Sequence, residues 1–148
     1  MTLADLSLIV RRHIKASPNR VFAAWTSPEA LKVWWGPQGV RCPDAQVDLT
    51  VGGHYRIANE LPDGRLLWIE GIFEEIVPDE KLVYSWVSSD LQPAPERVIV
   101  HFKPVREGTE VIVVHERIAS KAAVDDHTAG WEGCLDGLER LGLIGDVF

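Results

Sequence analysis

Apolar and polar positions alternate along the first part of the chain. One face of the segment 7–15 carries Leu8, Val10, Arg12 and Ile14. The other face carries Ser7, Arg11, His13 and Lys15. Because successive side chains of a strand point to opposite faces, this alternation predicts a half-buried strand over 7–15.

Two short helices are predicted after this strand, over 19–25 and 29–35. Ser17-Pro18 precedes the first and Ser27-Pro28 the second. A serine can accept hydrogen bonds from the free N–H groups of a helix start, and proline suits the first helical turn. The segment 36–39, Gly-Pro-Gln-Gly, is expected to end the second helix.

The segment 40–117 alternates between strand patterns and turn residues. Six strands are predicted, over 41–49, 54–61, 65–77, 82–88, 97–104 and 109–117. The turn signals between them are Gly52-Gly53, Asp63-Gly64, Pro78-Asp79-Glu80-Lys81 and Glu107-Gly108. The segment 88–96, with Pro93 and Pro95, predicts a longer loop.

Alternation within these strands predicts one dry face and one wet face. The dry face is expected to carry Tyr55, Ile57, Asn59, Leu82, Tyr84, Trp86, Val98, Val100, Phe102, Val111, Val113 and His115. The wet face is expected to carry Arg56, Glu60, Arg97, His101 and Glu110. This division is typical of an antiparallel sheet that is covered on one side only.

A long helix is predicted from its cap at Ser120 to about Leu143. Its apolar stripe is Val124, His127, Trp131, Cys134, Leu135, Leu138 and Leu141. The helix also contains Gly130, Gly133 and Gly137, each of which costs about 1 kcal/mol relative to alanine. We therefore expect the sheet to hold this helix, and the glycines to let backbone or ligand approach it closely.

These elements predict an α+β fold, in which a curved seven-stranded antiparallel sheet surrounds the C-terminal helix. The two short helices follow the first strand. We expect one domain over 1–148, with an internal pocket between the sheet and the long helix. The pocket is inferred from this architecture alone.

Composition and charge exclude several classes of partner. The net charge is −7, and the 15 Lys and Arg residues are scattered, so neither nucleic acid nor an anionic membrane surface is an expected partner. No apolar run approaches the roughly 20 residues that a membrane span needs. The segment 1–7 lacks the pattern of a secretory signal, so a cytoplasmic location is expected. Cys42 and Cys134 are expected to be reduced thiols, because a structural zinc site needs closely spaced pairs of ligands.

The chain resembles a known family along nearly its whole length. The matching stretches are Ala16-Ser17-Pro18, Val21-Phe22, Ala24-Trp25-Thr26, Trp34-Trp35-Gly36-Pro37, Gly52-Gly53, Pro62-Asp63-Gly64, Gly71-Ile72-Phe73, Pro78, Lys81-Leu82-Val83-Tyr84-Ser85-Trp86, Gly108-Thr109, His115, His127, Gly130-Trp131 and Leu135. They resemble the bacterial activator-of-Hsp90-ATPase-like (AHSA1-type) subgroup of the Bet v 1-like/START-related (SRPBCC) superfamily. The resemblance implies a helix-grip fold. It also implies an affinity for lipids, hormones or polyketides and, in a minority of members, reactions such as cyclisation. Activation of Hsp90 is not carried over, because fold does not imply function.

Six tryptophans are the unusual feature of the composition. Trp34, Trp35, Trp86 and Trp131 lie where the pocket is expected, where large rings with one N–H donor suit an apolar or flat ligand. The alternative is that they fill the core. On a helix, adjacent Trp34 and Trp35 are not expected both to point inward, so one of them should face the pocket mouth or a neighbouring subunit.

His115 and His127 are the candidate catalytic residues, because both are predicted to face the pocket and an imidazole can move a proton. The alternative is a histidine bonded to a backbone carbonyl or to Asn59. A metal would need a third ligand, such as Asp126 or Glu70. Since neither histidine belongs to a ligand-spaced pair, no metal is expected. No cofactor motif is present either.

The predicted function is the binding of a small apolar or aromatic ligand. The expected ligand-binding residues are Trp35, Tyr55, Ile57, Asn59, Tyr84, Trp86, His115, His127, Trp131 and Leu135. One alternative is a homodimerising interaction domain that uses Trp34 or Trp35 and edge strands. The other is a cyclase or dehydratase that uses a pocket histidine, assisted by Glu70, Asn59 or Tyr84.

Overall fold

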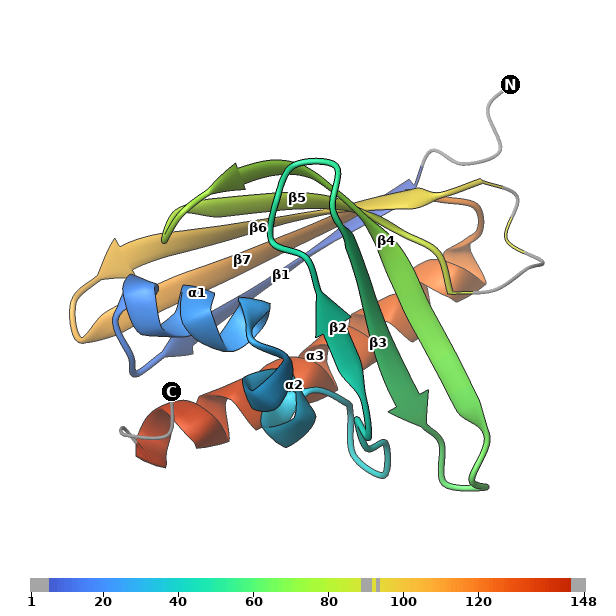
Figure 1. Ribbon diagram of the computed structural model, residues 1–148, viewed down its shortest axis with the longest axis horizontal. Coiled ribbons are helices and arrows are strands. Elements are labelled where there is room, and N and C mark those ends of the chain that lie inside the picture. Colours follow the sequence, from blue (N-terminus) through green and yellow to red (C-terminus); the bar gives the residue numbers. More distant parts are fainter. Residues whose placement is uncertain (1–5, 89–91, 93, 145–148) are drawn as a thin grey trace.

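The computed structural model describes residues 6–88, 92 and 94–144. The elements run in the order β1 (Leu6–Ile14), α1 (Pro18–Thr26), α2 (Pro28–Trp34), β2 (Ala45–Val47), β3 (His54–Glu60), β4 (Leu66–Val77), β5 (Lys81–Trp86), β6 (Glu96–Val105), β7 (Gly108–Ile118) and α3 (Lys121–Ile144). The seven strands form one antiparallel sheet in the order β1-β7-β6-β5-β4-β3-β2 (Figure 1). The predicted α+β helix-grip fold is confirmed. Positions 1–5 of the N-terminal segment, and 89–91 and Pro93 of the predicted loop, lie outside the described residues.

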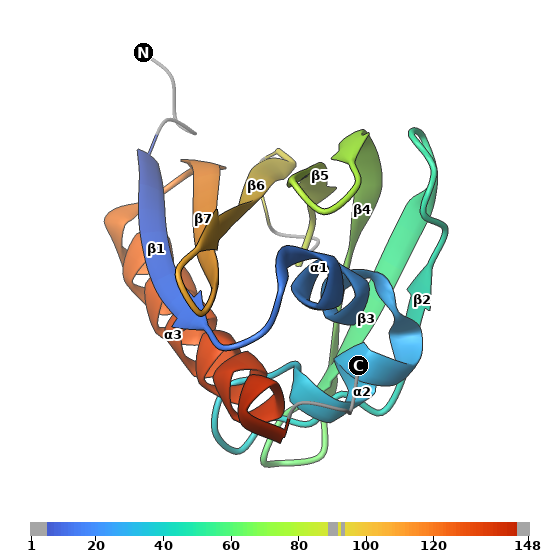
Figure 2. The ribbon, with the colours of Figure 1, turned by 90° about the vertical axis from the view of Figure 1, so that its left-hand side faces the viewer.

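The sheet is strongly curved, and all three helices lie on its concave side (Figure 2). Part of the curvature comes from β4, which carries a bulge between Phe73 and Glu75. Just before the bulge, the backbone at Gly71 passes so close to Ser85 that a side-chain carbon there would overlap the carbonyl oxygen of Ser85. The hydroxyl of Tyr55 donates to the same carbonyl over 2.6 Å. The bend therefore turns β3 and the second half of the sheet toward the helices.

The predicted dry face is confirmed in full. Its twelve residues, from Tyr55 on β3 to His115 on β7, are all buried. The predicted wet-face residues are all partly exposed. The sheet therefore has the one-sided cover that the alternation indicated.

The predicted strand over 41–49 is shorter in the structure. Only Ala45–Val47 forms β2, while Arg41 pairs with Glu60 as an isolated bridge. Pro43 lies between the two pieces and has no N–H to donate to the ladder, so continuous pairing stops there.

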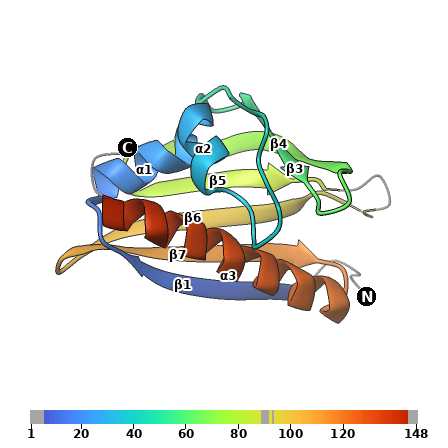
Figure 3. The same ribbon diagram turned by 90° about the horizontal axis from the view of Figure 1, so that it is seen from below.

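The glycines of α3 allow close contact with the segment that follows α1, as predicted (Figure 3). A side-chain carbon at Gly133 would lie 2.6 Å from Cα of Pro37, and one at Gly137 would overlap the carbonyl oxygen of Trp34. At Gly130 such a carbon would meet nothing within 4 Å. Two of the glycines thus serve backbone packing, and the third borders open space.

The prediction that only one of Trp34 and Trp35 can point inward is wrong. Both are buried, with exposed fractions of 2% and 5%. Helix α2 ends at Trp34, and the backbone of Trp35 is extended, at φ −71° and ψ 138°. The two side chains are therefore not separated by the rotation of about 100° per residue that a continuous helix imposes.

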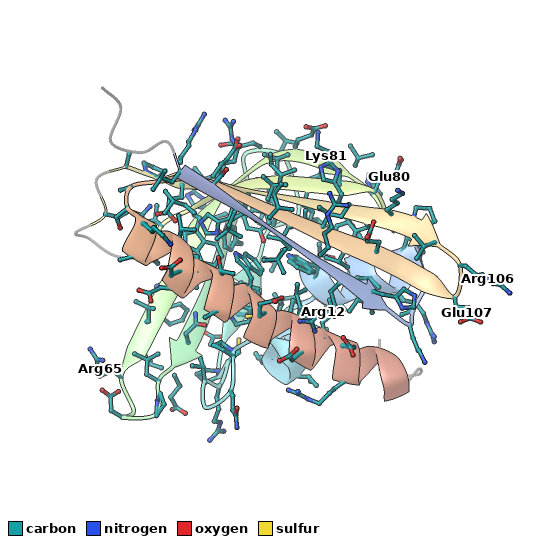
Figure 4. The ribbon with its side chains drawn as sticks, turned by 180° about the vertical axis from the view of Figure 1, so that it is seen from behind. Arg12, Arg65, Glu80, Lys81, Arg106 and Glu107 are labelled. Carbon is teal, nitrogen blue, oxygen red and sulfur yellow. The ribbon has the colours of Figure 1, made fainter. Side chains whose placement is uncertain are left out.

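Arg12 connects the first strand to the last helix. Its side chain reaches from the concave face of β1 to the surface of α3, where it contacts the carboxylates of Glu132, Asp136 and Glu139 at 3.3, 2.7 and 3.1 Å (Figure 4). Its alkyl stem follows the apolar face while its charge reaches solvent. This ion cluster ties the edge strand β1 to α3.

The described helices include none that is long and apolar enough to cross a membrane.

Candidate functional site

Five of the six tryptophans form a connected cluster between the sheet and the helices. Trp131 on α3 stacks on Trp25 of α1, with ring centroids 5.9 Å apart. It also contacts Trp35 and Trp86, each at 5.5 Å. Trp34 joins through Trp25 and Trp35. Trp68 lies on the other face of the sheet under the guanidinium of Arg56, 4.1 Å from the ring centroid.

A pocket of about 180 Å³ lies beside this cluster, between α3, β3, β4 and the segment after α2. Its lining residues are Trp35, Pro37, Val40, Asn59, Leu61, Leu67, Ile69, Trp86, Ser88, Asp126, His127, Gly130, Trp131 and Cys134. Most of this wall is apolar, with three indole rings and a few polar groups, which is the composition of a small-molecule site.

The indole N–H groups around the pocket are used differently. Trp35 donates from Nε1 to Oδ1 of Asn59 over 2.9 Å. The amide nitrogen of Asn59 donates in turn to the carbonyl oxygens of Ile57 and Leu67, both at 3.2 Å. Asn59 is thus committed to holding Trp35 in place. In contrast, the buried Nε1 of Trp86 has no hydrogen-bond partner within the described ranges.

A buried Glu–His–His cluster adjoins the pocket through His127. The carboxylate of Glu96, at the start of β6, accepts on Oε1 from Nε2 of His115 over 2.7 Å. Nε2 of His127 on α3 lies 3.0 Å from the same oxygen. The two imidazole rings stack, with centroids 4.5 Å apart and planes 14° apart. His115 is fully buried, whereas 19% of the His127 side chain is exposed.

Trp131 determines which nitrogen of His115 carries the proton. Its Nε1 donates to Nδ1 of His115 over 3.0 Å. An indole N–H can only donate, so Nδ1 must be unprotonated, and the proton lies on Nε2, facing Glu96. Burial lowers the pKa of His115 despite the nearby carboxylate, which keeps this imidazole neutral.

Glu96 is ionised in this arrangement. Burial alone would raise its pKa, but the hydrogen bonds from His115 and His127 outweigh burial and lower the pKa of Glu96 to about 2. A carboxylate accepts hydrogen bonds and donates none, so His127 also presents a protonated Nε2 to Glu96. The remaining nitrogen of His127, Nδ1, makes no hydrogen bond with any described residue.

The same three side chains are the described group whose geometry could hold a metal ion, with ligand atoms within 4.8 Å of one another. The hydrogen bond from Trp131 argues against that use. A histidine that binds a metal through Nε2 normally donates from Nδ1 to an acceptor, whereas here Nδ1 faces a donor. Neither of the third ligands considered from the sequence belongs to this group: Glu70 is exposed and lies 3.8 Å from Arg56 on the outer face, and Asp126 is exposed on α3.

The predicted ligand-binding residues fall into three groups. Those that line the pocket are Trp35, Asn59, Trp86, His127 and Trp131. Tyr55, Ile57 and Tyr84 line a smaller cavity of about 20 Å³ on the far side of the cluster, together with Trp25 and Phe73. His115 and Leu135 are fully buried and line neither cavity. The ring nitrogens of His115 are hydrogen-bonded to Glu96 and Trp131, and not to Asn59 or a backbone carbonyl as the alternative expected.

The tyrosines of the smaller cavity are occupied by structural hydrogen bonds. Tyr84 accepts on its hydroxyl from Nε1 of Trp25 over 3.2 Å, and Tyr55 donates to Ser85. Burial raises the pKa of both hydroxyls. No hydrogen bond joins either tyrosine to His115 or His127 among the described residues.

Both cysteines are free and buried, as the sequence indicated. Cys134 lines the pocket, and burial raises the pKa of its thiol to about 12. Burial likewise raises the pKa of Cys42 to about 11. These thiols stay protonated near neutral pH and behave as small apolar side chains.

Glu96 is the residue that sequence reasoning missed. The inward row Val98, Val100 and Phe102 continues backward by two residues to Glu96. The predicted strand began at 97, after Pro95, and a glutamate was not expected on a dry face. The unbroken alternation was the signal that could have placed Glu96 on the dry face. Its carboxylate can be buried there because His115 and His127 lie beside it.

Comparison with known proteins agrees with this architecture. The model of the family described as Activator of Hsp90 ATPase homolog 1-like protein matches residues 15–142. No curated protein matches the chain.

Solved bacterial structures share the fold. A protein from Chromobacterium violaceum is 27% identical and superimposes with a TM-score of 0.84, over 91% of this chain and 95% of that chain. One from Rhodobacter sphaeroides is 25% identical, with a TM-score of 0.81 over 97% of this chain and 95% of that one. The AHSA1 protein from Silicibacter pomeroyi is 24% identical, with a TM-score of 0.81 over 93% and 99%, and shows likeness of fold alone. With the family match over residues 15–142, the chain belongs to the family of activator of Hsp90 ATPase homolog 1-like proteins.

Proposed function

We propose that this protein binds a small apolar or aromatic molecule in the pocket beside Trp131. The observation that carries the proposal is the pocket itself: three indole rings and several aliphatic side chains enclose about 180 Å³ at the junction of sheet and helix. Such concave, largely apolar sites with a few polar groups are typical of small-molecule binding.

The volume of the pocket limits the size of the ligand. An apolar cavity of about 150 Å³ is enough to hold benzene. A pocket of about 180 Å³ therefore suits one or two rings or a short branched chain. A larger ligand, such as a flavonoid or a fatty acid, would have to extend beyond the pocket mouth.

The test is a ligand panel of single-ring aromatics, flavonoids, polyketides and fatty acids. A ligand should raise the melting temperature and quench tryptophan emission, because Trp35, Trp86 and Trp131 line the site. Isothermal calorimetry should then give the affinity. If no compound in the panel produces either change, the proposal fails.

Gly130 offers a way to fill the pocket without disturbing the helix. Added atoms at Gly130 meet open space, and this residue lines the pocket. The variant Gly130→Leu should fold and lose ligand binding. Ala129→Leu is the matched control, because Ala129 is exposed on the same helix and should keep wild-type affinity. Equal binding by both variants would place the ligand elsewhere.

The alternative of a homodimerising interaction domain loses the two tryptophans that were expected to contribute to its surface. Trp34 and Trp35 are both buried, so neither presents an apolar ring to another subunit. Small-molecule binding is therefore the function that the geometry supports best.

A further inference from the structure

The polar atoms around the pocket differ in whether they are free for a ligand. Nε1 of Trp35 is bound to Asn59, and Nε1 of Trp131 is bound to His115. Both N–H groups of the Asn59 amide donate to backbone carbonyls, and its Oδ1 accepts from Trp35. These groups shape the wall but offer no free N–H to a ligand.

His127 lines the pocket, and one of its two ring nitrogens makes no hydrogen bond with a described residue. Its Nε2 is engaged with Glu96 at 3.0 Å, while Nδ1 makes no hydrogen bond within the described part of the chain. Nε2 presents its proton to the carboxylate, so whenever the ring carries a single proton Nδ1 is a lone-pair acceptor. Glu96 holds this ring in one tautomer, as a carboxylate does in an acid–base dyad. Glu96 is in turn held by the locked imidazole of His115.

The charges around the pocket select against anionic ligands. The lining residues include the carboxylate of Asp126 and no lysine or arginine, and the ionised Glu96 lies directly behind His127. A fatty-acid carboxylate would meet two like charges with no fixed cation to pair with. A neutral group is not repelled by these carboxylates, and if it donates a hydrogen bond it finds an acceptor in Nδ1 of His127.

We propose that the pocket takes a small neutral aromatic molecule that carries a hydroxyl group, and that the hydroxyl donates its hydrogen bond to Nδ1 of His127. This inference rests on the proposed function and adds the chemical class of the ligand. The indoles contact the ring, and the Glu96–His127 pair recognises the O–H. The Nε1 of Trp86 is likewise without a partner among the described residues, and the centroid of that ring lies 6.1 Å from the centroid of His127.

The test compares two probes of the same shape, 4-nitrophenol and nitrobenzene, by calorimetry with the full chain at a pH just below the pKa of the free phenol and above about 6.5, the ordinary pKa of an imidazole. At this pH most of the phenol in solution is neutral. We expect 4-nitrophenol to bind at least about tenfold more tightly, because an unpaired polar atom in a buried site weakens binding of the analogue that lacks the hydroxyl. The absorbance of bound 4-nitrophenol should move toward that of the phenolate, since the hydroxyl shares its proton with the imidazole.

The variant His127→Phe keeps a ring at this position and removes the acceptor. It should bind 4-nitrophenol no more tightly than it binds nitrobenzene, and the absorbance change should be lost. If this variant does not fold, His127→Leu serves the same purpose, because leucine suits a helix and its side chain offers no hydrogen-bond acceptor.

The outcomes separate this inference from the proposed function. If both probes bind equally to the wild type, or if His127→Phe retains the preference for 4-nitrophenol, the pocket binds apolar molecules but the assignment of the hydroxyl to His127 is wrong. If neither probe binds, while other members of the panel do, the ligand class is wrong. If nothing in the panel binds, the proposed function itself fails.

Discussion

The indole Nε1 of Trp131 lies 3.0 Å from Nδ1 of His115 and donates a hydrogen bond to it. The two residues lie on different elements, α3 and β7, and both are buried. This contact fixes the proton of His115 on Nε2, where Glu96 accepts it. The contact therefore decides between two possible uses of the Glu96–His115–His127 cluster. Metal binding needs an unprotonated Nε2, whereas an acid–base pair does not.

The first prediction concerns metal ions. Zinc should leave the melting temperature of the wild-type protein unchanged, because His115 cannot offer Nε2 while Trp131 donates to Nδ1. The variant Trp131→Phe frees Nδ1 to take the proton, so zinc should raise its melting temperature. Thermal unfolding with added zinc, and with a chelator as the reference, measures both effects. Stabilisation of the wild type by zinc would show that the tautomer is assigned wrongly.

A second prediction concerns acid stability. Burial lowers the pKa of His115 in the folded state. As the pH falls below about 6.5, the unfolded chain therefore takes up a proton there first, and the free energy of unfolding begins to fall. The pKa of Glu96 is lowered from 4.5 to about 2. The contribution of Glu96 to the free energy of unfolding is therefore complete above about pH 4.5, and it is lost as the pH falls toward about 2. That second loss should be on the order of 3 kcal/mol.

Urea unfolding at a series of pH values measures this dependence. The matched variant Glu96→Gln should be less stable near neutral pH and should lack the second loss, because glutamine does not titrate. A variant that keeps the same loss between about pH 4.5 and about pH 2 would mean that other carboxylates cause it.

The third prediction uses two glycines of one helix. Gly130→Ala should stabilise the protein by up to about 1 kcal/mol, because alanine is the better helix former and the added carbon meets open space. Gly137→Ala should destabilise it by about 1–3 kcal/mol, since the added carbon overlaps the carbonyl oxygen of Trp34. Chemical denaturation gives both values. Equal effects of the two substitutions would contradict the close packing of α2 on α3.

A fourth prediction concerns the ion cluster of Arg12. Arg12→Met keeps most of the alkyl stem and removes the contacts with Glu132, Asp136 and Glu139. We expect a loss of about 1–2 kcal/mol at low salt, above the value for a single surface pair because three carboxylates share one partly buried guanidinium. The loss should shrink at high salt. Arg11→Met, on the exposed face of the same strand, is the control and should change stability by less than about 0.5 kcal/mol.

Much of the fold could be predicted because its signals are local. Ser17 and Ser27 cap their helices as expected, accepting from the backbone N–H groups of Arg20 and Ala30 at 3.4 and 3.3 Å. The twelve residues that the alternation assigned to the dry face, from Tyr55 to His115, are all buried. Strand periodicity and helix capping depend on neighbours a few residues away, so they can be read without knowledge of the fold.

The site depended on contacts that are distant in sequence. Trp35 could not be placed without knowing that α2 ends one residue earlier, and Tyr84 and Trp86 share a strand face yet line different cavities. Part of the curvature of the sheet comes from the bulge in β4, next to the close approach of Gly71 to Ser85, and the strand pattern does not reveal either feature.

The sequence by itself determined the order of elements, the inward and outward faces, the caps, the glycine-rich face of the last helix and the presence of two histidines near its contact with the sheet. Only the tertiary structure decided that Glu96 joins His115 and His127, and that Trp131 locks the tautomer of His115. The physical reason is that periodicity specifies the direction of a side chain within its own element. Which side chains meet across elements is set by sheet curvature, strand register and helix packing, and these exist only in the folded chain.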